Sequence, residues 1–245
     1  MCFSEPMSYF NFIALTSASI YFYDKWRLAV PLFFLGLKDL LQGLSYKNIN
    51  EFRSTNFLTM LSWIHICFQP LMINLFASYF DKTFKYWNIV FALCFIFALY
   101  CITILKEFDI QNDTKCNAST NEEGLKRFIN IYTPPKALHQ YASSYDFCAD
   151  DTKSYMGRYH IGYKFNTDKY EFFRENIFLL LFCIPFFTKA KIISFGFLLF
   201  AVILNIFSRM EYLGTGEYAA MWCFSVTIPA LLFAFFNKTT KKYCT

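Results

Sequence analysis

Residues Phe57–Phe80 read FLTMLSWIHICFQPLMINLFASYF, and this stretch decides the class of fold. It contains no Asp, Glu, Lys or Arg. A helix needs about 20 mostly apolar residues to cross the hydrocarbon core of a bilayer. The apolar run is continuous, whereas a lipid-facing β-strand would alternate apolar and polar residues. The stretch therefore predicts a membrane-spanning helix.

Six further stretches fit the same template: Ser8–Tyr23, Leu28–Leu44, Tyr86–Leu105, Phe172–Thr188, Ile192–Phe207 and Ala219–Phe236. Ser8–Tyr23 is rich in small hydroxylated residues, and the purely apolar part of Phe172–Thr188 is short. For these two stretches a buried or re-entrant helix is the alternative. We expect an all-α fold: a polytopic membrane helix bundle with about seven transmembrane helices, forming one domain over residues 1–245. Because Met1–Pro6 lacks the basic segment of a cleavable signal peptide, the first helix is expected to remain as an anchor.

The composition agrees with a membrane protein. Of 245 residues, 56% are hydrophobic and 17% charged, against about 45–50% and about 25% in soluble domains. This excludes an intrinsically disordered chain, which needs low hydrophobicity and high net charge. The net charge of +5 needs no nucleic-acid partner, because basic residues gather on one side of the predicted membrane.

With seven spans, one side receives nine basic residues: Lys25, Arg27, Lys82, Lys85, Lys189, Lys191, Lys238, Lys241 and Lys242. The other side receives three, Lys47, Arg53 and Arg209. Basic residues in short loops favour the cytoplasmic side, while long loops cross largely regardless of charge. We therefore expect the N-terminus outside or in a lumen and the C-terminus in the cytosol.

The long loop between the fourth and fifth helices, Lys106 to Glu171, is then extracytoplasmic. It carries two glycosylation patterns, at Asn112 and Asn117, which matter only on that side. Cys116 and Cys148 lie in the same loop and either pair in an oxidising compartment or remain separate thiols. We expect the loop to form a small extramembrane insertion.

Polar residues within the spans mark a candidate pocket, because such groups usually face a bundle interior or a water-filled cavity. On the second helix Asp39 and Gln42 share a face, and on the third Ser62, His65 and Gln69 form one polar stripe. Asn74 follows this stripe on the third helix. The predicted topology adds four residues on the outer side of the membrane, which complete the candidate set: His160, Arg209, Glu217 and Trp222. These positions predict a polar cavity that opens outward.

Each of these residues also has a purely structural interpretation. A buried His is more often a packing residue than a ligand or base, amides commonly link helices, and Lys38 beside Asp39 is expected to snorkel or form an ion pair. Glu217 suits a helix start and Trp222 an interfacial belt. The chain has no Walker loop, HExxH, GxSxG or CxxC motif. A mixed site of His65, Asp39 and Glu217 stays open as an alternative but has no diagnostic metal spacing, so no metal site is assigned and the cofactor is unknown.

Five short motifs occur in order and carry a family resemblance: Met1–Glu5 (MCFSE), Asp39–Gln42 (DLLQ), His65–Asn74 (HICFQPLMIN), Tyr159–Tyr163 (YHIGY) and Glu217–Cys223 (EYAAMWC). Together they resemble an uncharacterised family of small multi-pass membrane proteins of bacteria and large DNA viruses. The family pattern has Glu where Asp39 stands, a second Trp near His160 and an Asn-rich turn where this chain has Gly-Thr-Gly. The resemblance implies the topology and the residue set but no activity. It also implies that Cys2 and Cys223, both in family motifs and both placed outside, are a candidate disulfide pair.

Three functions remain open. The first is a transporter or channel for a small solute or ion, entered through the outer pocket. The second is an intramembrane enzyme with His65 as acid or base and Asp39 or Glu217 orienting it. The third is a structural or interaction protein of a membrane or viral envelope, in which the loop makes contacts and the polar residues only fasten helices.

Overall fold

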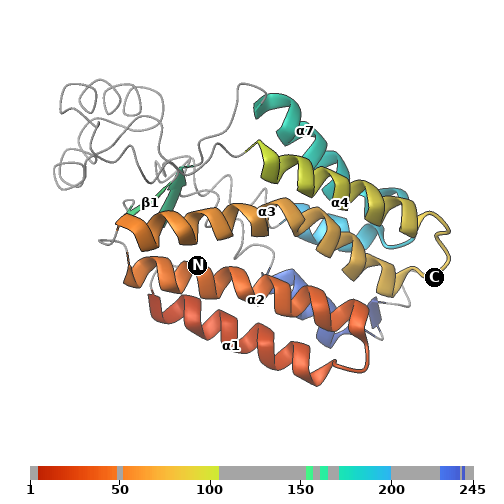
Figure 1. Ribbon diagram of the computed structural model, residues 1–245. Helices are drawn as coiled ribbons and strands as arrows, with labels where there is room; N and C mark the ends of the chain where they lie inside the picture. Colours follow the sequence, from red (N-terminus) through yellow and green to blue (C-terminus); the bar gives the residue numbers. More distant parts are fainter. Residues whose placement is uncertain are drawn as a thin grey trace.

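The computed structural model describes residues 5–48, 52–104, 153–156, 161–164, 171–199, 227–237 and 239–240. Its first half consists of four successive helices: α1 (Glu5–Tyr21), α2 (Trp26–Lys47), α3 (Phe52–Phe80) and α4 (Trp87–Thr103). Short connections make neighbouring helices antiparallel, and each helix packs against the one before it (Figure 1). This arrangement makes α3 the centre of the bundle.

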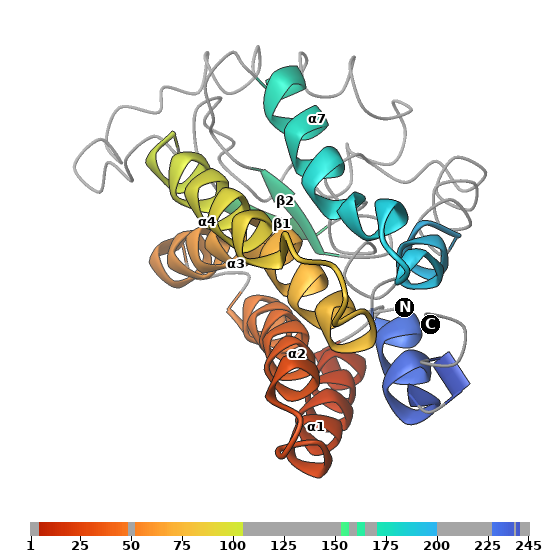
Figure 2. The ribbon, with the colours of Figure 1, turned by 90° about the vertical axis from the view of Figure 1, so that its right-hand side faces the viewer.

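The second half adds a hairpin and a broken helix. Strands β1 (Lys153–Met156) and β2 (Ile161–Lys164) pair antiparallel, with Lys153 opposite Lys164 and Met156 opposite Ile161. β1 contacts α3 and β2 contacts α2. Helix α7 (Glu171–Phe182) packs on α3 and α4 (Figure 2), and residues 191–199 and 227–235 are helical.

The expectation of a purely helical chain is therefore corrected at one place. A two-stranded sheet lies within the long loop, next to the C-terminal end of α2 and the N-terminal end of α3. Four-residue strands give too little alternating pattern to be distinguished from loop in a sequence.

Helix lengths bear on the seven expected spans. Among the described residues, two helical stretches are long and apolar enough to cross a membrane, Trp26–Lys47 and Phe57–Phe80. α1 and α4 have 17 residues each, which extend about 25 Å at 1.5 Å per residue. The candidate span Phe172–Thr188 is not one continuous helix. α7 ends at Phe182, and a 3₁₀ turn, η2 (Ile184–Phe187), follows it. Pro185 in this turn has no backbone N–H and therefore cannot continue the helical hydrogen-bond pattern.

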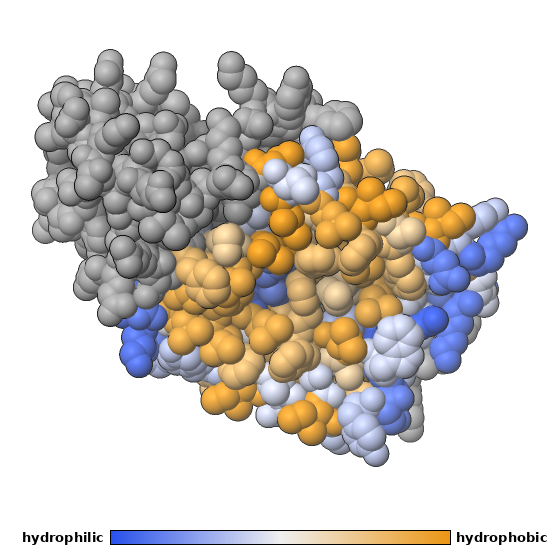
Figure 3. All heavy atoms as spheres, viewed as in Figure 1, coloured by the Kyte–Doolittle hydropathy of each residue, from blue (hydrophilic) through white to orange (hydrophobic). Residues whose placement is uncertain are grey.

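Apolar side chains cover the outside of the bundle as well as its core. The most exposed include Phe10 at 66%, Ile96 at 63% and Phe187 at 78%. Others lie along the outer faces of the helices, namely Ile13, Ile20, Val30, Phe33, Ile89, Leu93, Leu99, Leu180 and Phe195. In Figure 3 the face formed by the described residues is largely hydrophobic, with hydrophilic groups concentrated toward its ends.

The two ends of the bundle differ in charge. One end, here the basic end, carries Lys25, Arg27, Lys82, Lys85, Lys189 and Lys191. These residues come from the α1–α2 turn and the first turn of α2, the α3–α4 turn and the segment after η2. That segment is joined to the α3–α4 turn by a hydrogen bond from the Lys189 backbone N–H to Asp81 Oδ2, 3.0 Å long. The opposite end, here the hairpin end, is formed by the end of α2, the start of α3 and the two strands.

Candidate functional site

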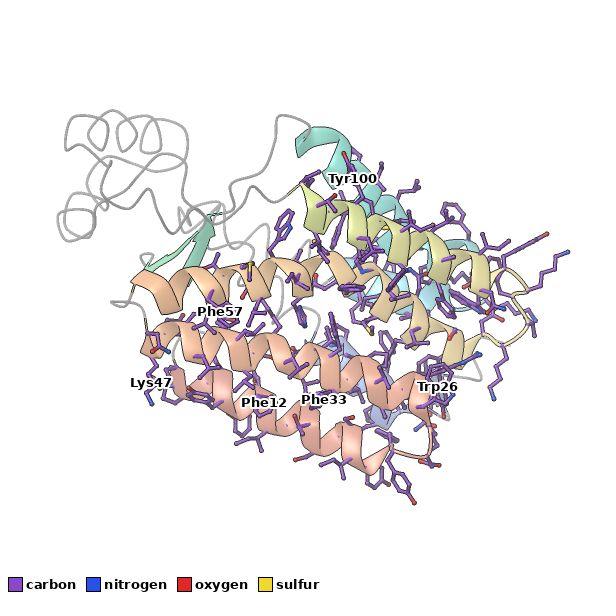
Figure 4. The ribbon with its side chains drawn as sticks, in the orientation of Figure 1. Phe12, Trp26, Phe33, Lys47, Phe57 and Tyr100 are labelled. Carbon is purple, nitrogen blue, oxygen red and sulfur yellow. The ribbon has the colours of Figure 1, made fainter. Side chains whose placement is uncertain are left out.

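Two polar stripes face each other where α2 packs on α3. Lys38 and Gln42 are four residues apart on α2, and Ser62, His65 and Gln69 follow at helical spacing on α3. We call these five residues together with Asp39 the polar seam. All six are buried, although they lie within helices whose outer faces are apolar. Trp26 and Lys47 mark the two ends of α2 (Figure 4), and Lys38, Asp39 and Gln42 lie in the half of that helix toward Lys47 and the hairpin end.

His65 fixes the register of the two helices. Its Nε2 atom lies 2.6 Å from the carbonyl oxygen of Phe34, and its ring stacks on the Phe34 ring with centroids 3.9 Å apart. Because a carbonyl oxygen only accepts, Nε2 carries the proton and donates. Since the helices are antiparallel, a residue one turn before His65 on α3 meets a residue one turn after Phe34 on α2. Ser62 therefore lies level with Lys38, and Lys38 is close enough to His65 to interact electrostatically.

Three seam residues keep buried polar atoms without a hydrogen-bond partner. These atoms are Nδ1 of His65, Oγ of Ser62 and both Oε1 and Nε2 of Gln42. Gln42 and Ser62 are 0% exposed and His65 is 5% exposed. A buried polar group left without a partner costs about 1–3 kcal/mol. Four such atoms on the facing sides of two helices are the feature that most needs a functional explanation.

Lys38 is a seam residue that was expected to pair with Asp39 while its ammonium group snorkels. The expected snorkelling is wrong, because Lys38 is 1% exposed. The spacing of Lys38, Gln42 and Ser45, all buried, places Lys38 on the face that meets α3. Asp39, the next residue, turns toward the neighbouring face, where Gly36 and Gly43 pack against α1. The seam thus contains one basic and one acidic side chain in succession.

Asn74 lies apart from the seam. It comes nine residues after His65, which is two and a half turns and places it on the opposite face of α3. Its Nδ2 donates to the carbonyl oxygens of Pro70 and Leu181, each at 2.8 Å. The second bond ties α3 to α7, as the helix-linking interpretation of amides expects.

Asp81 is a buried polar residue that sequence reasoning missed. Its Oδ1 accepts hydrogen bonds from Thr83 N at 2.9 Å, Thr83 Oγ1 at 2.7 Å and Phe84 N at 3.2 Å. Burial of the carboxyl opposes its ionisation, but the hydrogen bonds from Thr83, Lys189 and Phe84 outweigh burial, so the pKa of Asp81 lies below its ordinary value. Asp81 therefore organises the basic end of the bundle rather than the seam. Its position directly after an apolar helix was the available signal.

Several sequence-predicted residues lie outside the described residues. They are the pocket candidates His160, Arg209, Glu217 and Trp222, the cysteines Cys2, Cys116, Cys148 and Cys223, and the glycosylation candidates Asn112 and Asn117. Within the part of the chain that the structure describes, Cys94 and Cys183 are free thiols. No three His, Cys, Asp or Glu side chains in that part come together as a metal-binding group.

Comparison with known proteins bears on family and not on activity. No curated protein matches the chain, and no solved structure does. One family model matches residues 11–244, nearly the whole chain, and its description assigns no function. The match covers α2, α3, α4 and all six residues of the seam. The chain therefore belongs to the family of unknown function DUF5765.

Proposed function

We propose that the protein is an integral, multi-pass membrane protein that binds a small solute in the polar seam and carries it across the bilayer. The observation that carries this proposal is the inverted distribution of polarity. Large apolar side chains face outward on α1, α2 and α4, while Gln42, Ser62 and His65 are buried with unsatisfied polar atoms. Soluble monomers rarely expose apolar surface on this scale.

The outer surface suits lipid. Among the described residues, four of the five exposed Tyr and Trp side chains lie near the basic end, Tyr21, Tyr23, Trp26 and Tyr86, while the fifth, Tyr100, lies near the other end of α4. Tyr and Trp are enriched where a membrane meets water. Their position next to the basic end supports a bilayer whose cytosolic interface lies there. Seven spans, an outside N-terminus and a cytosolic C-terminus are part of this proposal.

The seam suits a solute better than a purely structural role. A polar group that only fastens helices uses its hydrogen-bonding atoms on the neighbouring helix, as Nδ2 of Asn74 does with Leu181. Ser62 Oγ and the Gln42 amide do not do so. Polar residues within a membrane whose hydrogen-bonding atoms are not paired with other parts of the protein commonly mark a substrate path. Because Gln42 and Ser62 lie toward the hairpin end, we expect the solute to enter from the outer side.

Flux measurements on reconstituted protein test this proposal. Liposomes containing the full chain should take up small polar solutes faster than empty liposomes. Gln42→Leu should abolish the difference, because it removes both unsatisfied amide atoms from the seam. Ser78→Ala is the matched control, since Ser78 is equally buried on α3 but already donates to Leu75 O at 2.7 Å. Wild-type liposomes that behave like empty ones across a panel of neutral, cationic and anionic solutes would exclude transport.

A further inference from the structure

We propose that the seam takes a small uncharged molecule that carries both hydrogen-bond donors and acceptors, such as a short amide or polyol. This inference rests on the proposed function and names the class of its solute. It is drawn from the unsatisfied atoms of Gln42, Ser62 and His65 and from the charges beside them.

The unsatisfied atoms require a ligand of mixed hydrogen-bonding character. With Nε2 of His65 donating to Phe34 O, Nδ1 of a neutral imidazole is an acceptor and needs a donor from the ligand. The Gln42 amide offers one acceptor and two N–H donors, and the Ser62 hydroxyl both donates and accepts. A ligand with only acceptors would leave Nδ1 and Oε1 unpaired. Hydroxyl and carboxamide groups supply both functions.

The charges of the seam favour a neutral ligand. Lys38 and Asp39 are adjacent on α2 and both are buried, so their formal charges sum to zero. A charged ligand would bring a net charge into a buried site between apolar helices, which is strongly unfavourable without a compensating partner. A neutral hydrogen-bonding molecule satisfies the open atoms without that penalty.

The spacing of the open atoms limits the size of the ligand. Ser62 lies almost one helical turn before His65, and Gln42 lies one turn after Lys38, which is level with Ser62. One turn of helix advances about 5.4 Å, so His65 and Gln42 lie about one turn from Ser62 on opposite sides, and the three positions together span about two turns. A molecule of a few non-hydrogen atoms reaches from Ser62 to one of these two neighbours. Acetamide and glycerol have this size and chemistry.

Equilibrium binding of radiolabelled probes to the purified full chain in detergent tests the inference. The neutral probes are acetamide and glycerol, and the charged probes of similar size are acetate and methylammonium. We expect saturable binding of at least one neutral probe and of neither charged probe. Ser62→Ala and Gln42→Leu should each weaken that binding about tenfold, as loss of a hydrogen bond worth about 1.4 kcal/mol implies. Ser78→Ala should leave it unchanged.

Folding is checked on the same samples. Gln42→Leu removes buried polar atoms that have no partner, so the ligand-free variant should melt at the wild-type temperature or above it. Lost binding in a variant of unchanged melting temperature therefore reports on the site.

In the binding experiment the inference would be overturned by saturable binding of acetate or methylammonium, by no saturable binding of either neutral probe, or by equal weakening by Ser78→Ala. Binding without flux in liposomes would overturn transport and leave this site in place. Flux that persists in Gln42→Leu and Ser62→Ala would overturn the site.

Discussion

Individual buried polar residues in this protein fall into two kinds, and Asp81 and Ser62 represent them. The Asp81 carboxylate accepts hydrogen bonds from Thr83, Phe84 and Lys189, so both of its oxygens are used within the fold. Ser62 Oγ has no such partner. Since a satisfied carboxylate stabilises structure and an unsatisfied hydroxyl does not, the two residues should respond to substitution in opposite ways.

Asp81→Asn should lower the free energy of unfolding by about 1–3 kcal/mol, because an amide nitrogen cannot accept a hydrogen bond from Thr83 or Lys189. Thermal unfolding of the purified variant in detergent measures this loss. Asp24→Asn is the matched control, since Asp24 is exposed in the α1–α2 turn at the same end of the bundle. Equal melting temperatures for wild type and Asp81→Asn would contradict the role given to this carboxylate.

The difference in stability between wild type and Asp81→Asn should depend on pH. Because folding lowers the pKa of Asp81, the ionised carboxylate stabilises the fold above its ordinary pKa of 3.8, and this contribution is lost as the pH falls through the lower folded-state value. The stability difference between wild type and Asp81→Asn should therefore be constant near neutral pH and shrink below about pH 4. A difference that persists unchanged at lower pH would show that ionisation of Asp81 is not its source.

At the scale of elements, the contact between α1 and α2 depends on two glycines. A Cβ atom at Gly36 would lie 3.2 Å from Leu15 Cβ, and one at Gly43 would lie 3.0 Å from the Tyr9 ring. The two glycines are seven residues apart and therefore share a face of α2. Small residues that let helix backbones approach closely are characteristic of helix pairs in membranes. The close approach buries Ser8 and Asn11 of α1 beside the face that carries Asp39.

Gly36→Leu should separate α1 from α2 and destabilise the protein by about 1–3 kcal/mol, the usual range for overpacking. The measurement is the melting temperature in detergent. Phe33→Leu, on the exposed face of the same helix, should change stability by less than about 0.5 kcal/mol. If Gly36→Leu melts like wild type, the α1–α2 contact is looser than its geometry implies.

Patterns within one element were predictable from the sequence, and contacts between distant elements were not. Apolar length located the helix that ends at Phe80, and helical spacing placed Ser62, His65 and Gln69 on one face. The same spacing would have placed Lys38 beside Gln42, but the cost of burying an ammonium made the surface the expected location. The bond from Lys189 to Asp81 joins residues 108 positions apart, and no local pattern encodes such a pairing. The hairpin was missed because its strands are too short for a periodic signal.

At the scale of the whole molecule, the antiparallel order of the helices distributes basic residues unequally between the two ends of the bundle. Five lysines and one arginine from three separate regions of the chain meet at the basic end, while the unsatisfied atoms of Gln42 and Ser62 lie toward the other end. A membrane protein with this asymmetry is expected to hold its basic end in the cytosol. A seam entered from the opposite side would then meet solutes outside the cell or in a lumen.

Labelling with a membrane-impermeant maleimide on intact cells decides this orientation. Lys47 is exposed near the hairpin end and Lys85 is exposed at the basic end, so the same substitution reports on both sides. Lys47→Cys should label in intact cells, above the background of the native cysteines in the parent protein. Lys85→Cys should rise above that background only after the membrane is permeabilised. The reverse pattern would invert the topology and place the seam toward the cytosol, whereas equal labelling of both positions in intact cells would mean that no bilayer separates the two ends.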